Sequence, residues 1–153
     1  MVDFSGQVVL QADEKNRYRI PAKYRSKFGE GPLHYMRNGN CYLSIISHKD
    51  CMAITSKLSK RVTLFEKPET RKIRQVMASI EEIKEDNQGR FTLPIELKQR
   101  MGLGKEIVFI GMGRHIELWN KEDWDKQCEE IDPQETFAEL CDLTFDDEDD
   151  ERV

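Results

Sequence analysis

Residues 13–21 read DEKNRYRIP, and residues 86–94, which lie 73 positions further along the chain, read DNQGRFTLP. Both stretches start with Asp, carry Arg four positions later and then an aromatic residue, and end with a branched aliphatic residue and Pro. The similarity continues at the same offset as far as Asp50 and Asp123. Because so many positions match at one fixed offset, we infer that the chain contains two copies of one structural unit.

Each copy is expected to form four short strands, since short apolar runs stand between turn-forming residues. The predicted strands cover residues 8–10, 18–20, 33–36 and 42–46 in the first copy and 79–83, 91–93, 106–110 and 116–119 in the second. Asn16 and Gly89 fall in the turn between the first two strands of each copy. Asn and Gly tolerate a positive φ best, so both residues fit a tight turn.

Helices are predicted over residues 22–28 and 95–101. Each follows a Pro, which is favoured in the first helical turn, and each is expected to end at a glycine, Gly29 or Gly102. Further helices are expected to begin at His48 and Lys121, to cover residues 69–79 and to cover residues 134–142. The last two are expected to pack through Ile73, Val76, Met77 and Ile80 and through Phe137, Leu140 and Cys141.

Four short strands cannot enclose a core alone, so the two copies together predict one mainly β protein with peripheral helices (α+β), arranged as a pseudo-twofold barrel. The expected boundaries are 6–51 for the first copy, 52–78 for linking helices, 79–124 for the second copy, 125–143 for C-terminal helices and 144–153 for a disordered acidic tail. No apolar run approaches the roughly 18–20 residues that span a bilayer, and the N-terminus lacks a basic secretory segment. We therefore expect a cytoplasmic protein.

The charge distribution is uneven. The net charge is −5, but residues 142–153 hold seven acids and one Arg, a net of −6, which leaves +1 for residues 1–141. Basic residues gather around the first motif, at Lys15, Arg17, Arg19, Lys23, Arg25 and Lys27. This asymmetry predicts a localised anion-binding surface beside a solvated acidic tail. A second basic stretch, over residues 57–74, is interpreted as a solvated face.

The repeated motif has a chemistry suited to DNA. Asp13 and Asp86 can accept backbone N–H groups and so fix the shape of a tight loop. Arg17 and Arg90 then project from defined places, and the planar guanidinium can grip a phosphate or pair with a guanine. We predict that Arg17, Arg90, Lys15, Arg19 and Lys23 contact DNA, and that Asp13, Asn16, Asp86 and Gly89 shape the loops. Alternatively, each Asp–Arg pair is only a salt bridge that closes its hairpin.

The paired motifs resemble the MraZ family, as do the segments RKIRQVMAS (71–79) and GKEIVFIGMGRHIELWNKEDW (104–124). The resemblance covers roughly residues 4–130. It implies a barrel of the swapped-hairpin AbrB/SpoVT class, completed within one chain from two tandem repeats. It also implies a nucleoid-associated transcriptional regulator that forms ring-shaped homo-oligomers and binds repeated promoter elements of division and cell-wall genes in double-stranded DNA. Asn16 replaces the family's usual Gly, and the acidic tail is not part of the family pattern.

Other functions are weighed against this one. No nucleophile motif or phosphate-binding loop occurs, and the histidines and cysteines lack the short spacings of metal ligands, so we expect no enzyme activity, metal or cofactor. AbrB-like barrels also serve in antitoxins, so a protein-interaction module acting through its acidic tail is the alternative. Antitoxin tails usually carry apolar anchors, whereas Phe145 and Val153 are the only large apolar residues after Leu143.

Overall fold

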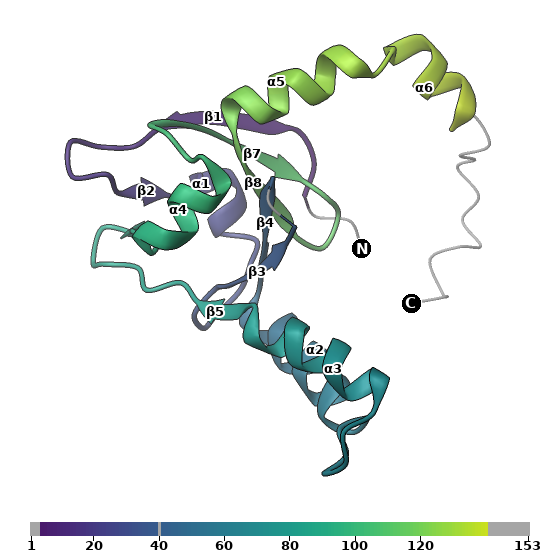
Figure 1. The fold of residues 1–153 in the computed structure, drawn as a ribbon. Coiled ribbons are helices and arrows are strands. Elements are labelled where there is room, and N and C mark those ends of the chain that lie inside the picture. Colours follow the sequence, from purple (N-terminus) through teal and green to yellow (C-terminus); the bar gives the residue numbers. More distant parts are fainter. Residues whose placement is uncertain (1–3, 40, 141–153) are drawn as a thin grey trace.

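The computed structural model describes residues 4–39 and 41–140, and its core is a mixed arrangement of sheet and helices (Figure 1). The strands are β1 (Gln7–Gln11), β2 (Tyr18–Arg19), β3 (His34–Asn38), β4 (Tyr42–Ile46), β5 (Ile80–Glu82), β6 (Arg90–Phe91), β7 (Glu106–Gly111) and β8 (Ile116–Asn120). The helices are α1 (Ala22–Arg25), α2 (His48–Ser59), α3 (Pro68–Ala78), α4 (Ile95–Met101), α5 (Lys121–Glu130) and α6 (Pro133–Glu139). The expected α+β class is confirmed.

Six strands form one antiparallel sheet in the order β1-β7-β8-β4-β3-β5, and β2 and β6 form a separate antiparallel pair. The first strand of each half pairs with the other half of the chain: β1 lies beside β7, and β5 lies beside β3. The two halves therefore exchange strands, and neither half contains its own complete sheet. β1 and β5 form the two edges of this sheet, so hydrogen bonds do not close it, and the barrel stays a prediction.

Residues that are 73 positions apart meet at two places in the fold. In the β4–β8 pair Ser44 lies opposite Glu117, with Leu43 and Ile45 opposite Leu118 and Ile116. In the β2–β6 pair Tyr18 lies opposite Phe91. A residue can pair with its own equivalent only on a local twofold axis, so both pairs lie on such an axis. This geometry accords with the repeat in the sequence, whereas the domain boundaries expected above stay predictions.

The main core lies between the large sheet and the β2–β6 pair. It is built from aromatic and branched residues of both halves, including Tyr18, Tyr24, Leu43, Phe91 and Phe109. A second cluster on the other face of the sheet joins Val108, Ile110 and Trp119 to Trp124 of α5 and to Tyr42. Burial of both faces explains why residues 107–110 of β7 are a continuous apolar run rather than an alternating one.

The helices form where the sequence predicts them, but some of them differ in length from the prediction. α4 ends at Gly102, whose φ of 63° is the left-handed stop that was expected, and Ser47 caps α2 by accepting the N–H of Asp50. The prediction of a helix over residues 22–28 was too long, because α1 ends at Arg25. The chain then tightens into i→i+3 hydrogen bonds, from Lys27 to Tyr24 and from Phe28 to Arg25, which carry the Phe28 ring into the core.

Burial predictions for two helices were wrong in part. Of the apolar residues expected to pack from α3, Ile73 is buried and Val76 is half-buried, whereas Met77 is exposed. On α6 the expected burial fails, since Phe137 is 83% exposed and Leu140 is also exposed. The extended backbone at Ile131 separates α6 from α5, and α6 continues away from the sheet, whose face is already covered by α5 (Figure 1).

Two predictions fall on the C-terminal segment. The burial of Cys141 and the disordered tail at 144–153 lie outside the described residues. Within residues 4–39 and 41–140 the longest helix is α2, with 12 residues, and no helix there has both the length and the apolar character for a membrane crossing.

Candidate nucleic-acid interface

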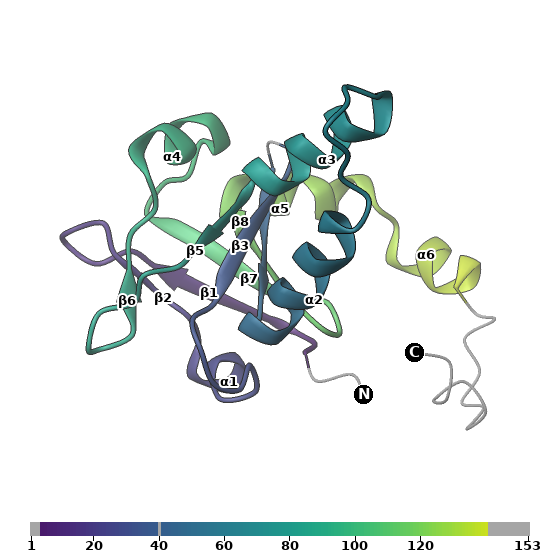
Figure 2. The same ribbon diagram turned by 90° about the horizontal axis from the view of Figure 1, so that it is seen from below.

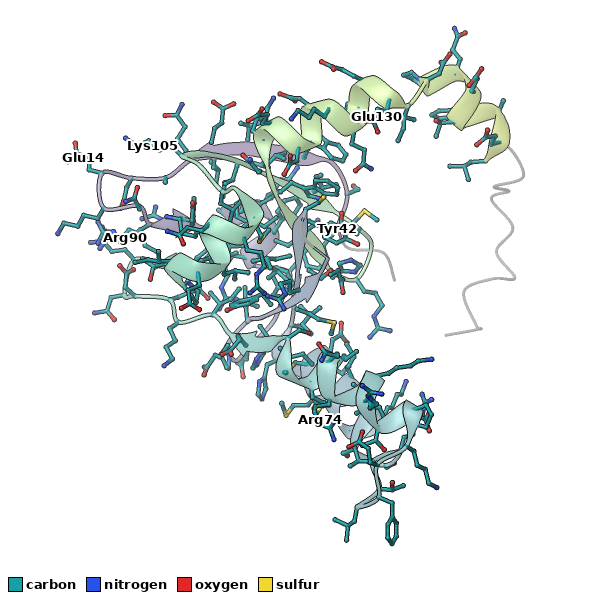
Figure 3. The ribbon with its side chains drawn as sticks, in the orientation of Figure 1. Glu14, Tyr42, Arg74, Arg90, Lys105 and Glu130 are labelled. Carbon is teal, nitrogen blue, oxygen red and sulfur yellow. The ribbon has the colours of Figure 1, made fainter. Side chains whose placement is uncertain are left out.

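The β1–β2 and β5–β6 loops project from the same side of the molecule, as Figures 1 and 2 both show. Figure 3 labels one residue of each hairpin, Glu14 and Arg90, at this side. Each loop enters one strand of the short β2–β6 pair, so the central Tyr18 and Phe91 anchor both loops to the core by burial. The loops are therefore fixed relative to each other by a rigid base.

The first loop is closed by the carboxylate of Asp13. One oxygen, Oδ1, accepts the backbone N–H of Lys15 and of Arg17, both at 2.9 Å, and the other, Oδ2, accepts Nε–H of Arg17 at 2.6 Å. Asn16 has a φ of 58°, the one positive φ of a residue other than glycine in the described parts of the chain. This geometry accords with the loop-shaping roles expected of Asp13 and Asn16, which stay predictions.

The second loop repeats this network. Oδ1 of Asp86 accepts the N–H of Gln88 at 2.8 Å and of Arg90 at 2.9 Å, and Oδ2 accepts Nε–H of Arg90 at 2.8 Å. Gly89 stands at the turn position with a φ of 76°. Since Asn and Gly reach the same backbone conformation, the departure from Gly at Asn16 leaves the loop geometry intact.

These contacts also govern the protonation of the two carboxyl groups. The N–H of Arg17 donating to Asp13 lowers the pKa of that carboxyl, and burial opposes this shift. The N–H of Arg90 lowers the pKa of Asp86 in the same way. Both carboxylates therefore stay ionised at neutral pH, and each holds its loop closed.

The Asp–Arg ion pair that was weighed as an alternative forms in both loops. It engages only the Nε of each guanidinium, and no described residue accepts a hydrogen bond from the terminal nitrogens of Arg17 or Arg90. The side chains of Arg17 and Arg90 are 25% and 27% exposed. Each loop thus presents a preorganised guanidinium with its outer edge open to a ligand.

Arg19 completes a cluster of three guanidinium groups. It is exposed, lies directly opposite Arg90 in the β2–β6 pair and has no ion-pair partner among the described residues. A groove of about 350 Å³ is lined by Arg17, Arg19 and Arg90 together with Asp13 and Gln11. Like charges that face each other across a strand pair destabilise it, so this groove favours an anionic occupant.

The other predicted contacts are placed differently. Lys15 is exposed on the first loop, outside the residues that line the groove. Lys23 is not in the cluster either, because its Nζ lies over the ring of Tyr24, 4.8 Å from the centroid, close to Gly6. Arg25, which belonged to the basic cluster of the sequence, donates from Nε to Glu85 at 3.1 Å and so braces the base of the second loop.

One basic residue was missed by the sequence reasoning. Lys98 of α4 places its Nζ 5.5 Å from the centroid of the Tyr18 ring, next to the β2–β6 pair. It stands at the position of the second copy that matches Arg25 in the first, 73 residues earlier. The match between Lys98 and Arg25 in the repeat was the one sequence signal for this residue. The contact of Lys98 with Tyr18 could not be predicted, because it depends on how the two halves pack together.

Comparison with known proteins agrees with the resemblance. A family model described as "MraZ protein, putative antitoxin-like" matches residues 77–146. Proteins named "Transcriptional regulator MraZ" are similar over most of their length. The one from Treponema denticola is 30% identical over 130 residues, 84% of this chain and 90% of the relative. The one from Caldanaerobacter subterraneus is 33% identical over 136 residues, 89% of this chain and 92% of the relative. With similarity of this extent along both chains, the protein is a member of the MraZ family.

Proposed function

We propose that this chain is a sequence-specific DNA-binding transcriptional regulator that acts as a homo-oligomer on repeated promoter elements. One observation carries the proposal: two matched loops hold Arg17 and Arg90 by Nε alone, beside Arg19, on one rigid strand pair. The relatives from Treponema denticola and Caldanaerobacter subterraneus are named as transcriptional regulators, which supports the same function. No catalytic role is proposed.

The shape of the site suits the major groove of DNA. That groove admits a two-stranded β-ribbon, and arginine pairs bidentately with O6 and N7 of guanine. We assign base contacts to Arg17 and Arg90, whose positions the carboxylates of Asp13 and Asp86 fix. Restriction of these side chains before binding reduces the entropy lost on binding and favours discrimination between sequences.

The remaining basic residues are assigned to the DNA backbone. Arg19 lies at the same groove and Lys15 on the first loop, where phosphates would flank the contacted bases. Lys23 lies further along, on α1, so we assign it a phosphate contact outside the groove. Phosphate contacts supply affinity that falls with salt and carry no sequence information of their own.

Self-association would raise the affinity of this small site for DNA. One chain offers a single pair of loops, whereas several joined copies would meet several tandem elements at a high effective concentration. We therefore infer a homo-oligomer, as a ring, with each β2–β6 pair facing the DNA. We also infer that the exchanged strands represent two tandem AbrB/SpoVT-like units in a pseudo-barrel. The targets would be promoter repeats of division and cell-wall genes, which implies a nucleoid-associated protein in the cytoplasm.

The experiment that tests this function is selection of bound duplexes from a random pool, followed by sequencing. We expect enrichment of one short element that recurs in tandem within the selected duplexes. A pool that stays random, while the protein binds a basic protein partner, would contradict DNA recognition and favour the antitoxin-like alternative. The same chain with Arg17 and Arg90 both changed to Ala is the matched control and is expected to enrich nothing.

A further inference from the structure

Two protruding parts of the chain leave large apolar side chains uncovered. The hairpin tip, defined as residues 60–67 between α2 and α3, exposes Val62, Leu64 and Phe65, of which Leu64 is fully exposed and Phe65 is 77% exposed. The C-terminal arm, defined as α5 and α6 (residues 121–140), exposes Ile131, Phe137 and Leu140. Clusters of exposed apolar side chains on projecting segments are typical of protein–protein contact surfaces.

The two parts carry opposite charges. Residues 57–74, the hairpin tip with its flanking helical turns, contain seven basic and two acidic residues, a net of +5. The C-terminal arm contains eight acidic and two basic residues, a net of −6. The charges are therefore nearly equal in size and opposite in sign.

Ion pairs inside each part leave most of this charge unpaired. Among residues 57–74, Arg61 pairs with Glu69 and Arg74 pairs with Glu66, whereas five cations have no acidic partner among the described residues: Lys57, Lys60, Lys67, Arg71 and Lys72. In the arm the lysines pair within α5, and six acids have no cationic partner among the described residues: Asp123, Glu129, Glu130, Asp132, Glu135 and Glu139.

These two surfaces do not meet within one chain. Figure 1 shows the α2–α3 hairpin and the C-terminal arm on separate projections of the molecule, Figure 2 shows α6 apart from that hairpin, and Figure 3 labels Arg74 on the hairpin and Glu130 at the end of α5. Each chain thus exposes two apolar clusters, one surrounded by basic residues and one surrounded by acidic residues. A second copy of the same chain offers the complement of each.

We propose that the hairpin tip of one copy binds the C-terminal arm of the next copy, in a head-to-tail interface. Leu64 and Phe65 pack against Phe137 and Leu140, and the unpaired lysines and arginines around the tip face the unpaired acids of the arm. An interface between two different surfaces of identical chains leaves one of each surface free at the ends, so assembly continues until it closes. This inference names the interface of the proposed homo-oligomer and rests on that self-association, but not on DNA binding.

An anionic lipid surface would fit only half of these observations. The basic hairpin tip with its exposed Phe and Leu suits such a surface, yet the acidic arm would be repelled by it. A second copy accounts for both surfaces, and for the match between their charges. We therefore assign the hairpin tip to the arm of a neighbouring copy.

The test uses two full-length variants, one that disrupts the hairpin tip and one that disrupts the C-terminal arm. The tip variant carries Leu64→Ser and Phe65→Ser, and the arm variant carries Phe137→Ser and Leu140→Ser. Because all four side chains are exposed, both variants should keep the melting temperature of a folded monomer. We expect each variant alone to be a monomer by light scattering at micromolar concentration. A mixture should give a one-to-one dimer and nothing larger, joined by the two intact surfaces.

A control and three outcomes make the test decisive. A third variant, with Ile95→Ser and Met112→Ser at two other exposed apolar positions, should assemble like the wild type. A mixture that stays monomeric, or a variant that assembles like the wild type, would overturn the interface while leaving the oligomer in place. A wild-type chain that is itself a monomer would overturn the proposed self-association. A wild-type monomer that binds anionic vesicles through the hairpin tip would assign that surface to lipid instead.

Discussion

Tyr18 lies directly opposite Phe91 at the centre of the β2–β6 pair, with ring centroids 6.0 Å apart, and both side chains are buried. The two residues hold equivalent places in the two halves of the chain, so one aromatic contact supports both arginine loops. The phenol of Tyr18 also donates to the carbonyl oxygen of Gly104 at 3.0 Å, which ties this contact to the segment before β7. Stability and loop position are therefore coupled at this pair.

Truncation of this pair should destabilise the whole fold. We expect Phe91→Ala to reduce the free energy of unfolding by about 3–5 kcal/mol, because a buried ring leaves a cavity. Tyr18→Phe should cost about 1 kcal/mol, from the lost hydrogen bond to Gly104. Chemical denaturation measures both, with Ile95→Ala, at an exposed position of α4, as a control within about 0.5 kcal/mol of wild type. A loss of only 1 kcal/mol for Phe91→Ala would mean that the pair does not support the core.

The two loop arginines should be needed for affinity and not for folding. We expect Arg17→Ala and Arg90→Ala each to weaken binding to the selected duplex by about 1–3 kcal/mol, the discrimination typical of a bidentate arginine–guanine pair. Each should change unfolding by less than about 1 kcal/mol, because a partly exposed ion pair contributes little. The control is Arg114→Ala, which removes the same charge from an exposed ion pair with Asp50. Wild-type affinity in both loop variants would show that the loops do not contact DNA.

The effect of substitutions at Asn16 on stability should depend on the backbone conformation of this residue. With a φ of 58°, this residue stands in the left-handed region, where a β-carbon costs about 1–2 kcal/mol unless a polar side chain compensates. Asn16→Ala should therefore destabilise the protein by about 1 kcal/mol, whereas Asn16→Gly should be nearly neutral. Gly89→Ala should be destabilising in the same way at the second loop. Equal stability of Asn16→Ala and Asn16→Gly would contradict the strain.

The matched loops were predictable from the sequence, and the contacts between halves were not. Within each motif the partners lie at most four positions apart, so the hydrogen bonds from the N–H groups of Arg17 and Arg90 to Asp13 and Asp86 depend on local sequence alone. The Arg25–Glu85 pair joins residues 60 positions apart, and it depends on how the halves dock. Phe137 is a second example of a feature that local sequence could not predict. Helical periodicity reveals an apolar face, but it does not reveal whether another surface covers that face.

Acid should weaken the loops through their two carboxylates. The pKa values of Asp13 and Asp86 are lowered in the folded protein, chiefly by the N–H groups of Arg17 and Arg90. Because the pKa of each carboxyl is lower in the folded protein than in the unfolded chain, the ionised groups stabilise the fold. This contribution is complete above the unfolded-state pKa of about 3.9 and is lost as the pH falls through the folded-state pKa. The melting temperature of wild type should therefore exceed that of the Asp13→Asn, Asp86→Asn double variant at neutral pH, and the difference should shrink below about pH 4. A difference that stays constant between pH 3 and pH 7 would exclude this contribution.

The acidic C-terminal segment should weaken non-specific DNA binding through its charge. Residues 146–151 are six consecutive acids, and their charge opposes the approach of phosphates to the same protein. Deletion of residues 144–153 should raise affinity for scrambled duplexes at low salt while the preferred sequence stays the same. Because salt screens charges over about 10 Å at 0.1 M, the gain should shrink as the ionic strength rises. The measurement is a salt titration of full-length and truncated protein on specific and scrambled duplexes, with light scattering to check that truncation leaves the assembly unchanged. Equal affinities of the two proteins for scrambled DNA at every salt concentration would show that the segment does not compete with phosphate.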